Sequence, residues 1–275
     1  MGRLFILDFD GTMTDAEAEG APFRAGYLED VATLCGRPLA EVEALAGAFE
    51  AEVAGAPDAH GWLFQGRIVA PATVDPYLRM MPVARKIFDA TGAFESDADR
   101  TRLLDGVLYK YNYLKTRTAF RPGAKEALAA LAGTETYVVT NSHTEAVQRK
   151  IEALGQGWLV PRVLGRAQKY VIDEAFTLVP AALALPGLSR PVLLRRRAYF
   201  ELIDSLRRAS GAAWSEVTVA GDVFELDLSL PLALGATVAL VVNDFTPAYE
   251  RAFVESHPRG RLVSALAELP GLAFP

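Results

Sequence analysis

The feature that most constrains the fold of this chain is a series of short apolar runs separated by segments of helical periodicity. A short apolar run bounded by turn residues is typical of a buried strand, and strands that alternate with helices are typical of parallel βαβ units. The clearest runs lie at Arg3–Phe9, Thr136–Thr140, Glu216–Gly221 and Thr237–Val242. The sequence therefore predicts an α/β fold with a parallel sheet.

The alternation is interrupted once, by a long stretch between Asp15 and about Phe120. Here Ala, Leu and Glu recur at helical spacing, with Gly and Pro between the helical segments. The expected helices are Tyr27–Leu34, Leu39–Val53, Val74–Ala90 and Asp97–Leu114. A chain of 275 residues suits one core domain with such an insertion.

Charge and composition exclude several classes of function. The net charge of −6 is not the basic balance of a general nucleic-acid binder, so no nucleic-acid partner is expected. No apolar run is long enough to span a membrane, and the apolar run at the N-terminus is too short for a signal peptide. Cys35 is the only cysteine, so no intramolecular disulfide is possible. We therefore expect a cytoplasmic protein without a membrane partner.

The first candidate site residues follow the first predicted strand, in Asp8-Phe9-Asp10-Gly11-Thr12. Side chains two positions apart in an extended segment point the same way, so Asp8 and Asp10 can face one pocket. Two carboxylates so close repel each other, and a divalent cation relieves that repulsion. A solvated Asp-Gly turn is the alternative interpretation of this pentapeptide.

A second acidic cluster follows the predicted strand that ends at Gly221. Asp222 comes directly after this strand, so it should lie at the same sheet edge as Asp8. Carboxylate oxygens suit a hard cation, and a site with few carboxylates suits Mg²⁺. Glu225 and Asp227 either join this shell or only cap the following helix.

A third strand end carries Thr140-Asn141-Ser142. A hydroxyl group beside backbone N–H groups at a helix N-terminus forms a cradle for phosphate. Asn141 or Ser142 would also serve as an ordinary helix cap. The order of the three strand ends along the chain favours a shared site over coincidence.

These motifs resemble those of the haloacid dehalogenase (HAD) superfamily. The D-x-D-G-T motif matches residues 8–12, the apolar strand ending in Thr matches 138–141, and G-D-x-x-x-x-D matches 221–227. The resemblance implies a Rossmann-like core over residues 1–14 and 121–275, with residues 15–120 as an inserted helical cap. It also implies a Mg²⁺-dependent phosphatase that acts on a small phosphorylated substrate.

The resemblance also implies roles for the matched residues. Asp8 would be the nucleophile, and Asp10 would be the general acid and base. Mg²⁺ would be held by the Asp8 carboxylate, the Asp10 backbone carbonyl and Asp222. Thr140 would hydrogen-bond the phosphoryl group. The further residues expected to contact the substrate are Gly11, Thr12, Asn141 and Ser142.

The family's remaining motif is a lysine, for which this chain offers more than one candidate. Lys169 follows the candidate strand Arg162–Leu164, and a compact ammonium suits a crowded site. Its rivals are Arg195, Arg196 and Arg197, which follow another possible strand at Pro191–Leu194. We predict that Lys169 supplies the positive charge.

Other functions remain open at this stage. A phosphomutase of the same superfamily would use the same residues, whereas a dehalogenase would lack the acid at position 10. A non-catalytic nucleotide-binding or phosphate-binding α/β module is disfavoured, because neither G-x-G-x-x-G nor a P-loop lysine motif follows the first strand.

Overall fold

The computed structural model describes residues 3–273, and the chain forms two compact units. The core unit contains the N-terminal segment to Asp15, the short segment Leu63–Ala70 and the chain from Phe120 onward. The insertion unit contains Ala16–Trp62 and Pro71–Ala119. Residues 63–70, which group with the core unit, lie inside the range 15–120 that the sequence assigned to a cap.

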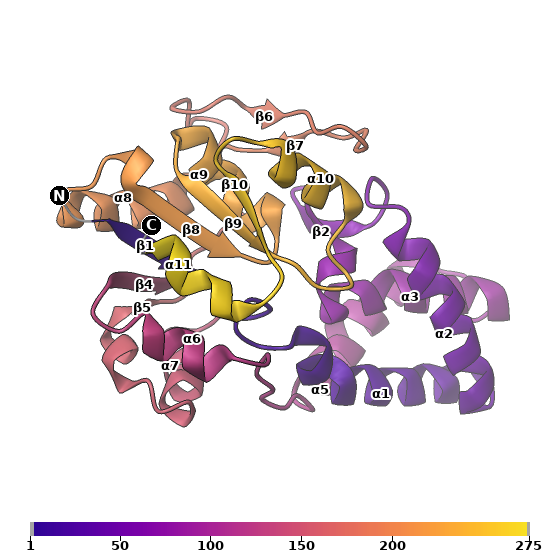
Figure 1. Ribbon diagram of the computed structural model, residues 1–275. Coiled ribbons are helices and arrows are strands. Elements are labelled where there is room, and N and C mark those ends of the chain that lie inside the picture. The colour runs from indigo at the N-terminus through magenta and orange to yellow at the C-terminus, as the bar shows by residue number, and fades with distance from the viewer. Residues whose placement is uncertain (1–2, 274–275) are drawn as a thin grey trace. The chain divides into compact units, whose positions relative to one another are not determined.

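The core unit is built on a six-stranded parallel sheet in the order β10-β9-β8-β1-β4-β5 (Figure 1). The predicted α/β fold with a parallel sheet is therefore confirmed. Strand β1 lies between β4 and β8, so the carboxyl ends of these three strands are neighbours at one sheet edge. The strands are β1 Leu4–Leu7, β4 Glu135–Val139, β5 Val163–Leu164, β8 Val217–Gly221, β9 Thr237–Val241 and β10 Gly260–Val263.

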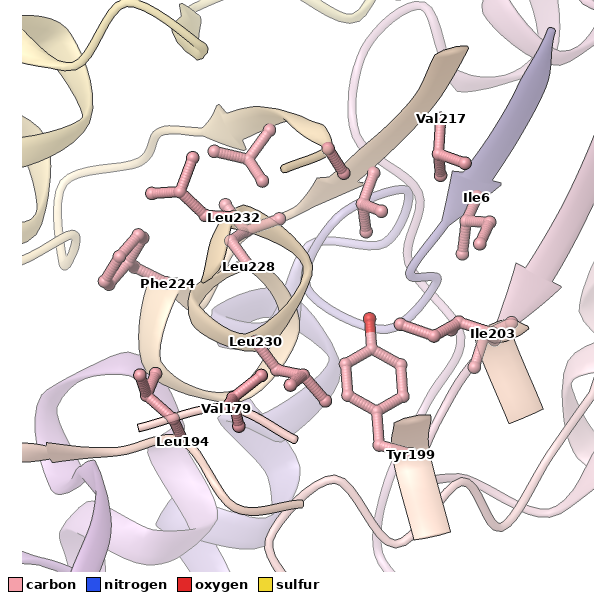
Figure 2. Close-up of a cluster of buried hydrophobic side chains, with 14 of the residues drawn as sticks. Ile6, Val179, Leu194, Tyr199, Ile203, Val217, Phe224, Leu228, Leu230 and Leu232 are labelled. Atoms are coloured by element: carbon pink, nitrogen blue, oxygen red, sulfur yellow. The ribbon is translucent and has the colours of Figure 1, made fainter. Parts of the chain in front are cut away.

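Helices cover both faces of this sheet, which is why its strands are apolar on both sides. Phe5 and Leu7 of β1 pack with residues of α6, α7 and α11, whereas Leu4 and Ile6 pack with α8, α9 and α10. Figure 2 shows Tyr199 and Ile203 of α8 near Ile6. The helices are α6 Ala124–Ala130, α7 Thr144–Ala153, α8 Arg197–Ser210, α9 Ser229–Leu234, α10 Ala248–Ser256 and α11 Leu269–Ala273.

The segment between β5 and α8 contains little regular structure. Its strands β6 (Ala182–Leu183) and β7 (Val192–Leu193) pair only with each other, in antiparallel orientation. The run Pro191–Leu194 is thus outside the parallel sheet, and β5 is the strand beside β4. The short turns of the core unit are η3 Gly157–Arg162, η4 Trp214–Glu216, the π-helical η5 Phe224–Leu228 and η6 Leu266–Glu268.

The insertion unit is helical, with its own buried core. Sequence signals explain its best-defined helix, α3: Asp75 accepts the backbone N–H groups of Tyr77 and Leu78, Pro76 occupies the first turn, and Gly92 ends the helix with φ +69°. Its elements are α1 Ala16–Cys35, α2 Leu39–Ala54, η1 Ala72–Val74, α3 Pro76–Thr91, α4 Asp97–Leu103, the π-helical η2 Leu104–Leu108 and α5 Tyr109–Tyr113.

Helix α1 begins eleven residues before the expected start at Tyr27 and contains Pro22. Proline has no N–H group for the carbonyl four residues earlier, which is that of Ala18. The Arg117 guanidinium donates a hydrogen bond to this carbonyl at 2.8 Å. A contact from a distant part of the insertion thus compensates the interruption, and local sequence does not reveal it.

A β-hairpin between α2 and α3 was not predicted either. Strands β2 (Gly61–Phe64) and β3 (Arg67–Pro71) pair through a two-residue turn in which Gln65 and Gly66 have φ of +50° and +76°. Two positive φ angles match the twist of a tight hairpin. No helix within residues 3–273 is long and apolar enough to cross a membrane.

Candidate active site

Asp8 follows the last residue of β1, in the middle of the sheet. Its backbone N–H donates to the carbonyl of Ala220 at 2.8 Å, which extends the pairing of β1 with β8. The side chain is buried, with the Lys169 ammonium 2.6 Å from Oδ1 and the Thr12 hydroxyl 3.1 Å from Oδ2. The pairing of the strands therefore fixes the Asp8 carboxylate before any ligand binds.

Gly11 brings the chain close to a second carboxylate. Its φ of +84° favours glycine, and a Cβ atom at this position would lie 2.3 Å from Asp222 Oδ2. The next residue, Thr12, is fully buried, with its hydroxyl 3.0 Å from Asp222 Oδ1 as well as near Asp8. Gly11 and Thr12 were expected to contact the substrate. The structure instead places the Thr12 side chain between two carboxylates.

Asp8, Asp222 and Asp227 form a cluster of three buried carboxylates, with oxygens that lie within 4.8 Å of one another. Asp222 and Asp227 come from the segment after β8, and Gly221 allows their approach, because its Cβ would lie 2.5 Å from that of Asp227. The sequence left open whether Glu225 or Asp227 joins the cluster. Asp227 is the residue that lies there.

Lys169 contacts two of these three carboxylates and is almost fully buried. Its ammonium is 2.6 Å from Asp8, 2.8 Å from Asp227 and 5.5 Å from the centre of the Tyr199 ring. Burial alone would lower the pKa of Lys169, but the charges of Asp227 and Asp8 outweigh it and raise the pKa above its ordinary value. The lysine is therefore charged at neutral pH.

One ammonium does not balance three carboxylates. Burial raises the pKa of Asp8 well above its ordinary value, and the charges of Asp227 and Asp222 add to this effect. Burial and the charge of Asp227 raise the pKa of Asp222 to about 7. Carboxylates that retain protons so readily will exchange them for a cation, and oxygen donors suit Mg²⁺. The donor set thus fits a divalent ion.

The Asp10 carboxylate lies outside the cluster of three. It pairs with the Lys150 ammonium of α7 at 2.7 Å, and both side chains are partly exposed. Only the backbone carbonyl of Asp10, which was the atom expected to bind metal, is available for that role. The side chain is available for proton transfer.

Thr140 follows β4, beside Asp8. Its buried hydroxyl oxygen accepts the backbone N–H of Ser142 at 3.1 Å, so the hydroxyl hydrogen can be donated to a ligand. Asn141 was expected to contact substrate, but its Oδ1 accepts the backbone N–H of Lys169 at 2.8 Å. Asn141 therefore holds the lysine segment, whereas Ser142 is partly exposed at the start of α7.

The three rival arginines lie apart from the carboxylate cluster. Arg195 is 3.3 Å from Glu174, and Arg197 pairs with Asp173. Arg196 is buried and donates to backbone carbonyls.

Glu225 is fully buried but lies in a different network from Asp227. Arg190 contacts both of its carboxylate oxygens at 2.7 Å, and the Tyr249 hydroxyl donates to it at 2.8 Å. Both carboxylate oxygens of Glu225 are therefore engaged by groups outside the carboxylate cluster.

Two residues around the site, Lys150 and Tyr199, carried no signal in the sequence, and a third, Arg196, was named only as a rival to Lys169. Lys150 lies in the last turn of α7, Arg196 is one of three adjacent arginines, and Tyr199 lies on an amphipathic helix. The Tyr199 hydroxyl donates to the backbone carbonyl of Asp227 at 2.8 Å. Each becomes identifiable only once the fold brings it beside a motif residue.

Comparison with known proteins agrees with this geometry. The family profile "haloacid dehalogenase-like hydrolase" matches residues 3–229. No curated protein sequence matches the chain.

Among solved structures, the HAD hydrolase YfnB from Bacillus subtilis, bound to magnesium, has a TM-score of 0.57 at 16% identity, covering 100% of this chain and 99% of the other. A predicted phosphoglycolate phosphatase from Haemophilus somnus has a TM-score of 0.56 at 16% identity, covering 98% and 97%. A HAD family hydrolase from Deinococcus radiodurans, with bound phosphate and sodium, has a TM-score of 0.51 at 17% identity, covering 100% and 98%. These likenesses show the fold, and the profile shows the family. The chain belongs to the haloacid dehalogenase-like hydrolases and is an enzyme of the hydrolase class.

Proposed function

We propose that this hydrolase is a Mg²⁺-dependent phosphatase that acts on a small phosphorylated metabolite through an aspartyl-phosphate on Asp8. One observation carries the proposal: Asp8, Asp222 and Asp227 are buried together at the carboxyl edge of the sheet, with the Lys169 ammonium against two of them. Such an arrangement is costly without a further cation, because buried charges need partners.

The metal would be held by the Asp8 carboxylate, the Asp222 carboxylate and the backbone carbonyl of Asp10. When bound, it supplies positive charge that lets an anionic phosphate approach an anionic nucleophile. Asp227 has a different task. Its Oδ1 accepts from Lys169 and its Oδ2 accepts from the Val223 N–H, so it orients the lysine.

The chemistry then depends on the chain's own side chains. Asp8 attacks phosphorus through a carboxylate oxygen and displaces the alcohol, which divides one difficult displacement into two easier steps. Asp10, released from its pair with Lys150, donates a proton to the leaving oxygen and later accepts one from the attacking water.

Two further groups would stabilise the phosphoryl oxygens during both steps. Thr140 donates its hydroxyl hydrogen to one of them, and the Lys169 ammonium balances their charge. Both groups are held in place before substrate binds, Thr140 by the Ser142 N–H and Lys169 by two carboxylates.

The names of similar structures support this reaction class. The Haemophilus somnus protein is described as a phosphatase, the Deinococcus radiodurans structure holds phosphate, and the Bacillus subtilis structure holds magnesium. The acid at position 10 favours phosphoryl transfer over dehalogenation, since a halide leaves without a proton.

The test is hydrolysis of a generic aryl phosphate by the full chain, with Mg²⁺ and with EDTA. We expect turnover only with Mg²⁺, none in Asp8→Asn, and weaker Mg²⁺ binding in Asp222→Ala by titration calorimetry. Arg208→Gln, at an exposed arginine that pairs with Asp204 on α8, is the control and should behave as wild type. Turnover that survives EDTA or Asp8→Asn would remove the proposed mechanism.

A further inference from the structure

Arg196 is the largest of the fully buried side chains in the described chain, and all three nitrogen groups of its guanidinium donate to backbone carbonyls. Nε donates to Leu193 at 3.0 Å, one terminal nitrogen to Val69 at 3.0 Å, and the other to Lys169. Burial lowers the pKa of Arg196 to about 10, so the group remains charged at neutral pH. A buried charge here joins three segments that are distant in sequence.

Arginine suits this position because its planar fork carries donors in several directions at once. A lysine ammonium on a flexible stem would reach fewer of the three carbonyls. Burying a cation is expensive unless its partners compensate, so the three carbonyls must be held in place around it. The guanidinium in turn holds the three carbonyls in place.

One of those carbonyls belongs to Lys169, and the backbone of this residue is held at both ends. Its N–H donates to Asn141 and its carbonyl accepts from Arg196. The preceding loop is strained, since Arg166 and Gln168 have φ of +56° and +51°. The side chains of Asn141 and Arg196 keep this loop from relaxing. The Lys169 backbone that they hold directs the ammonium toward Asp8.

The same guanidinium ties the lysine segment to the β2–β3 hairpin, at the part of it (Leu63–Ala70) that belongs to the core unit. Val69 of β3 supplies the third carbonyl. Two further contacts join the hairpin to the residues after Lys169: the Phe64 ring lies 6.2 Å from the Tyr170 ring, and Arg67 is 2.6 Å from Glu174. The hairpin and the lysine segment are thus one connected assembly with Arg196 at its centre.

We propose that Arg196 is a positioning residue for Lys169: it holds the lysine backbone against the hairpin so that the ammonium stays between Asp8 and Asp227. Its effect on catalysis rests on the proposed function, whereas its effect on the place of Lys169 does not. Displacement of a catalytic group by about 1 Å can cost on the order of 10²-fold in rate. We therefore expect Arg196→Met to lower kcat by about that factor with little change in KM.

The first measurement reads the position of Lys169 without any need for activity. Native protein is dimethylated at its lysines with formaldehyde and a mild reductant, and labelling of each lysine is followed by mass spectrometry. Exposed Lys125 serves as the internal reference. We expect slow labelling of Lys169 in the wild type and labelling at least several-fold faster in Arg196→Met, with Arg196→Lys in between.

Two control variants separate positioning from general loss of stability. Arg162→Met removes another guanidinium of the core unit, which donates to the Thr134 carbonyl before the start of β4. Leu128→Ala opens a cavity under α6, in the core on the opposite face of the sheet from α8. Neither should speed the labelling of Lys169 relative to Lys125. Equal labelling in Leu128→Ala and Arg196→Met would overturn the proposal.

The two proposals fail in different ways. If Lys169 becomes reactive in Arg196→Met but the wild type has no phosphatase activity, the positioning role stands and the proposed function falls. If Arg196→Met lacks a cooperative thermal transition, Arg196→Lys decides the question alone. Labelling of Lys169 at the wild-type rate in folded Arg196→Met refutes the positioning role.

Discussion

At the scale of single residues, the site has few hydrogen-bond donors, and each of them lies against more than one carboxylate. The Lys169 ammonium contacts Asp8 and Asp227, and the Thr12 hydroxyl lies near Asp8 and Asp222. A hydroxyl has one hydrogen, so Thr12 donates to only one carboxylate at a time. Each donor therefore controls the orientation of oxygens on more than one carboxylate.

Replacing Thr12 by valine keeps the shape of the side chain and removes this donor. We expect Thr12→Val to weaken Mg²⁺ binding about tenfold, as is typical when a group that orients a metal ligand is lost. Titration calorimetry measures this change, and Thr12→Ser, which keeps the hydroxyl, should bind Mg²⁺ nearly as tightly as the wild type. An unchanged affinity in Thr12→Val would show that the hydroxyl does not orient the ligands.

Asp10 offers a second test at this scale. As the proton donor to the leaving oxygen, its loss in Asp10→Asn should lower turnover of an alkyl phosphate by about 10²–10⁴-fold. In kcat/KM, which leaves out the later hydrolysis of the aspartyl-phosphate that also uses Asp10, the loss should be much smaller for a nitrophenyl phosphate, because that leaving group needs little protonation. Steady-state rates for both substrates decide the point. An equal loss for both would contradict a general-acid role.

At the scale of elements, the strand ends were predictable and the segments between them were only partly so. Strands β1, β4, β8 and β9 combine apolar runs with turn residues at their ends, and the motif residues follow the ends of the first three directly. Because parallel strands end at one sheet edge, their order alone brought Asp8, Thr140 and Asp222 to one place.

The unpredicted elements depend on contacts between distant residues. Helix α1 passes through Pro22 because Arg117 satisfies the exposed carbonyl of Ala18. The β2–β3 hairpin groups with the core through Val69 and Arg196, whose sequence separation gives no local signal. For the same reason, the sequence did not indicate that Asn141 and Thr12 would hold other site residues.

The hairpin turn gives a prediction at this scale. Gln65 has a positive φ, which a non-glycine residue other than Asn or Asp adopts at a cost, whereas Asn-Gly is the preferred pair for such a turn. Gln65→Asn should therefore raise the free energy of unfolding by up to about 1 kcal/mol. Gly66→Ala, at φ +76°, should lower it. Chemical denaturation of both variants tests this, and an inverted order would contradict the observed turn.

At the scale of the whole molecule, the balance of charge in the core links stability to pH and to Mg²⁺. The pKa of Asp222 rises from 3.8 to about 7 in the folded state, mainly through burial. Between about pH 4 and 7 the folded protein therefore holds a proton that the unfolded chain has released. Without divalent cations, stability contributed by this proton is present at low pH and is lost as pH rises through 7.

Mg²⁺ favours the ionised carboxylates, so its effect should run against that of protons. We expect saturating Mg²⁺ to raise Tm more at pH 8 than at pH 5.5. In Asp222→Asn most of this difference between the two pH values should disappear. Thermal scans at both pH values measure it, and a Mg²⁺ effect that is larger at pH 5.5 would contradict the assignment of Asp222 to the metal.

Asp8 is the proposed nucleophile, and trapping the covalent intermediate tests this role most directly. Protein turning over an aryl phosphate with Mg²⁺ is quenched with borohydride, which reduces an aspartyl-phosphate to homoserine. We predict that mass spectrometric sequencing finds homoserine at position 8, and that neither enzyme without substrate nor Asp8→Asn yields it. Steady turnover with aspartate intact at position 8, or with the reduced residue elsewhere, would contradict the proposed mechanism.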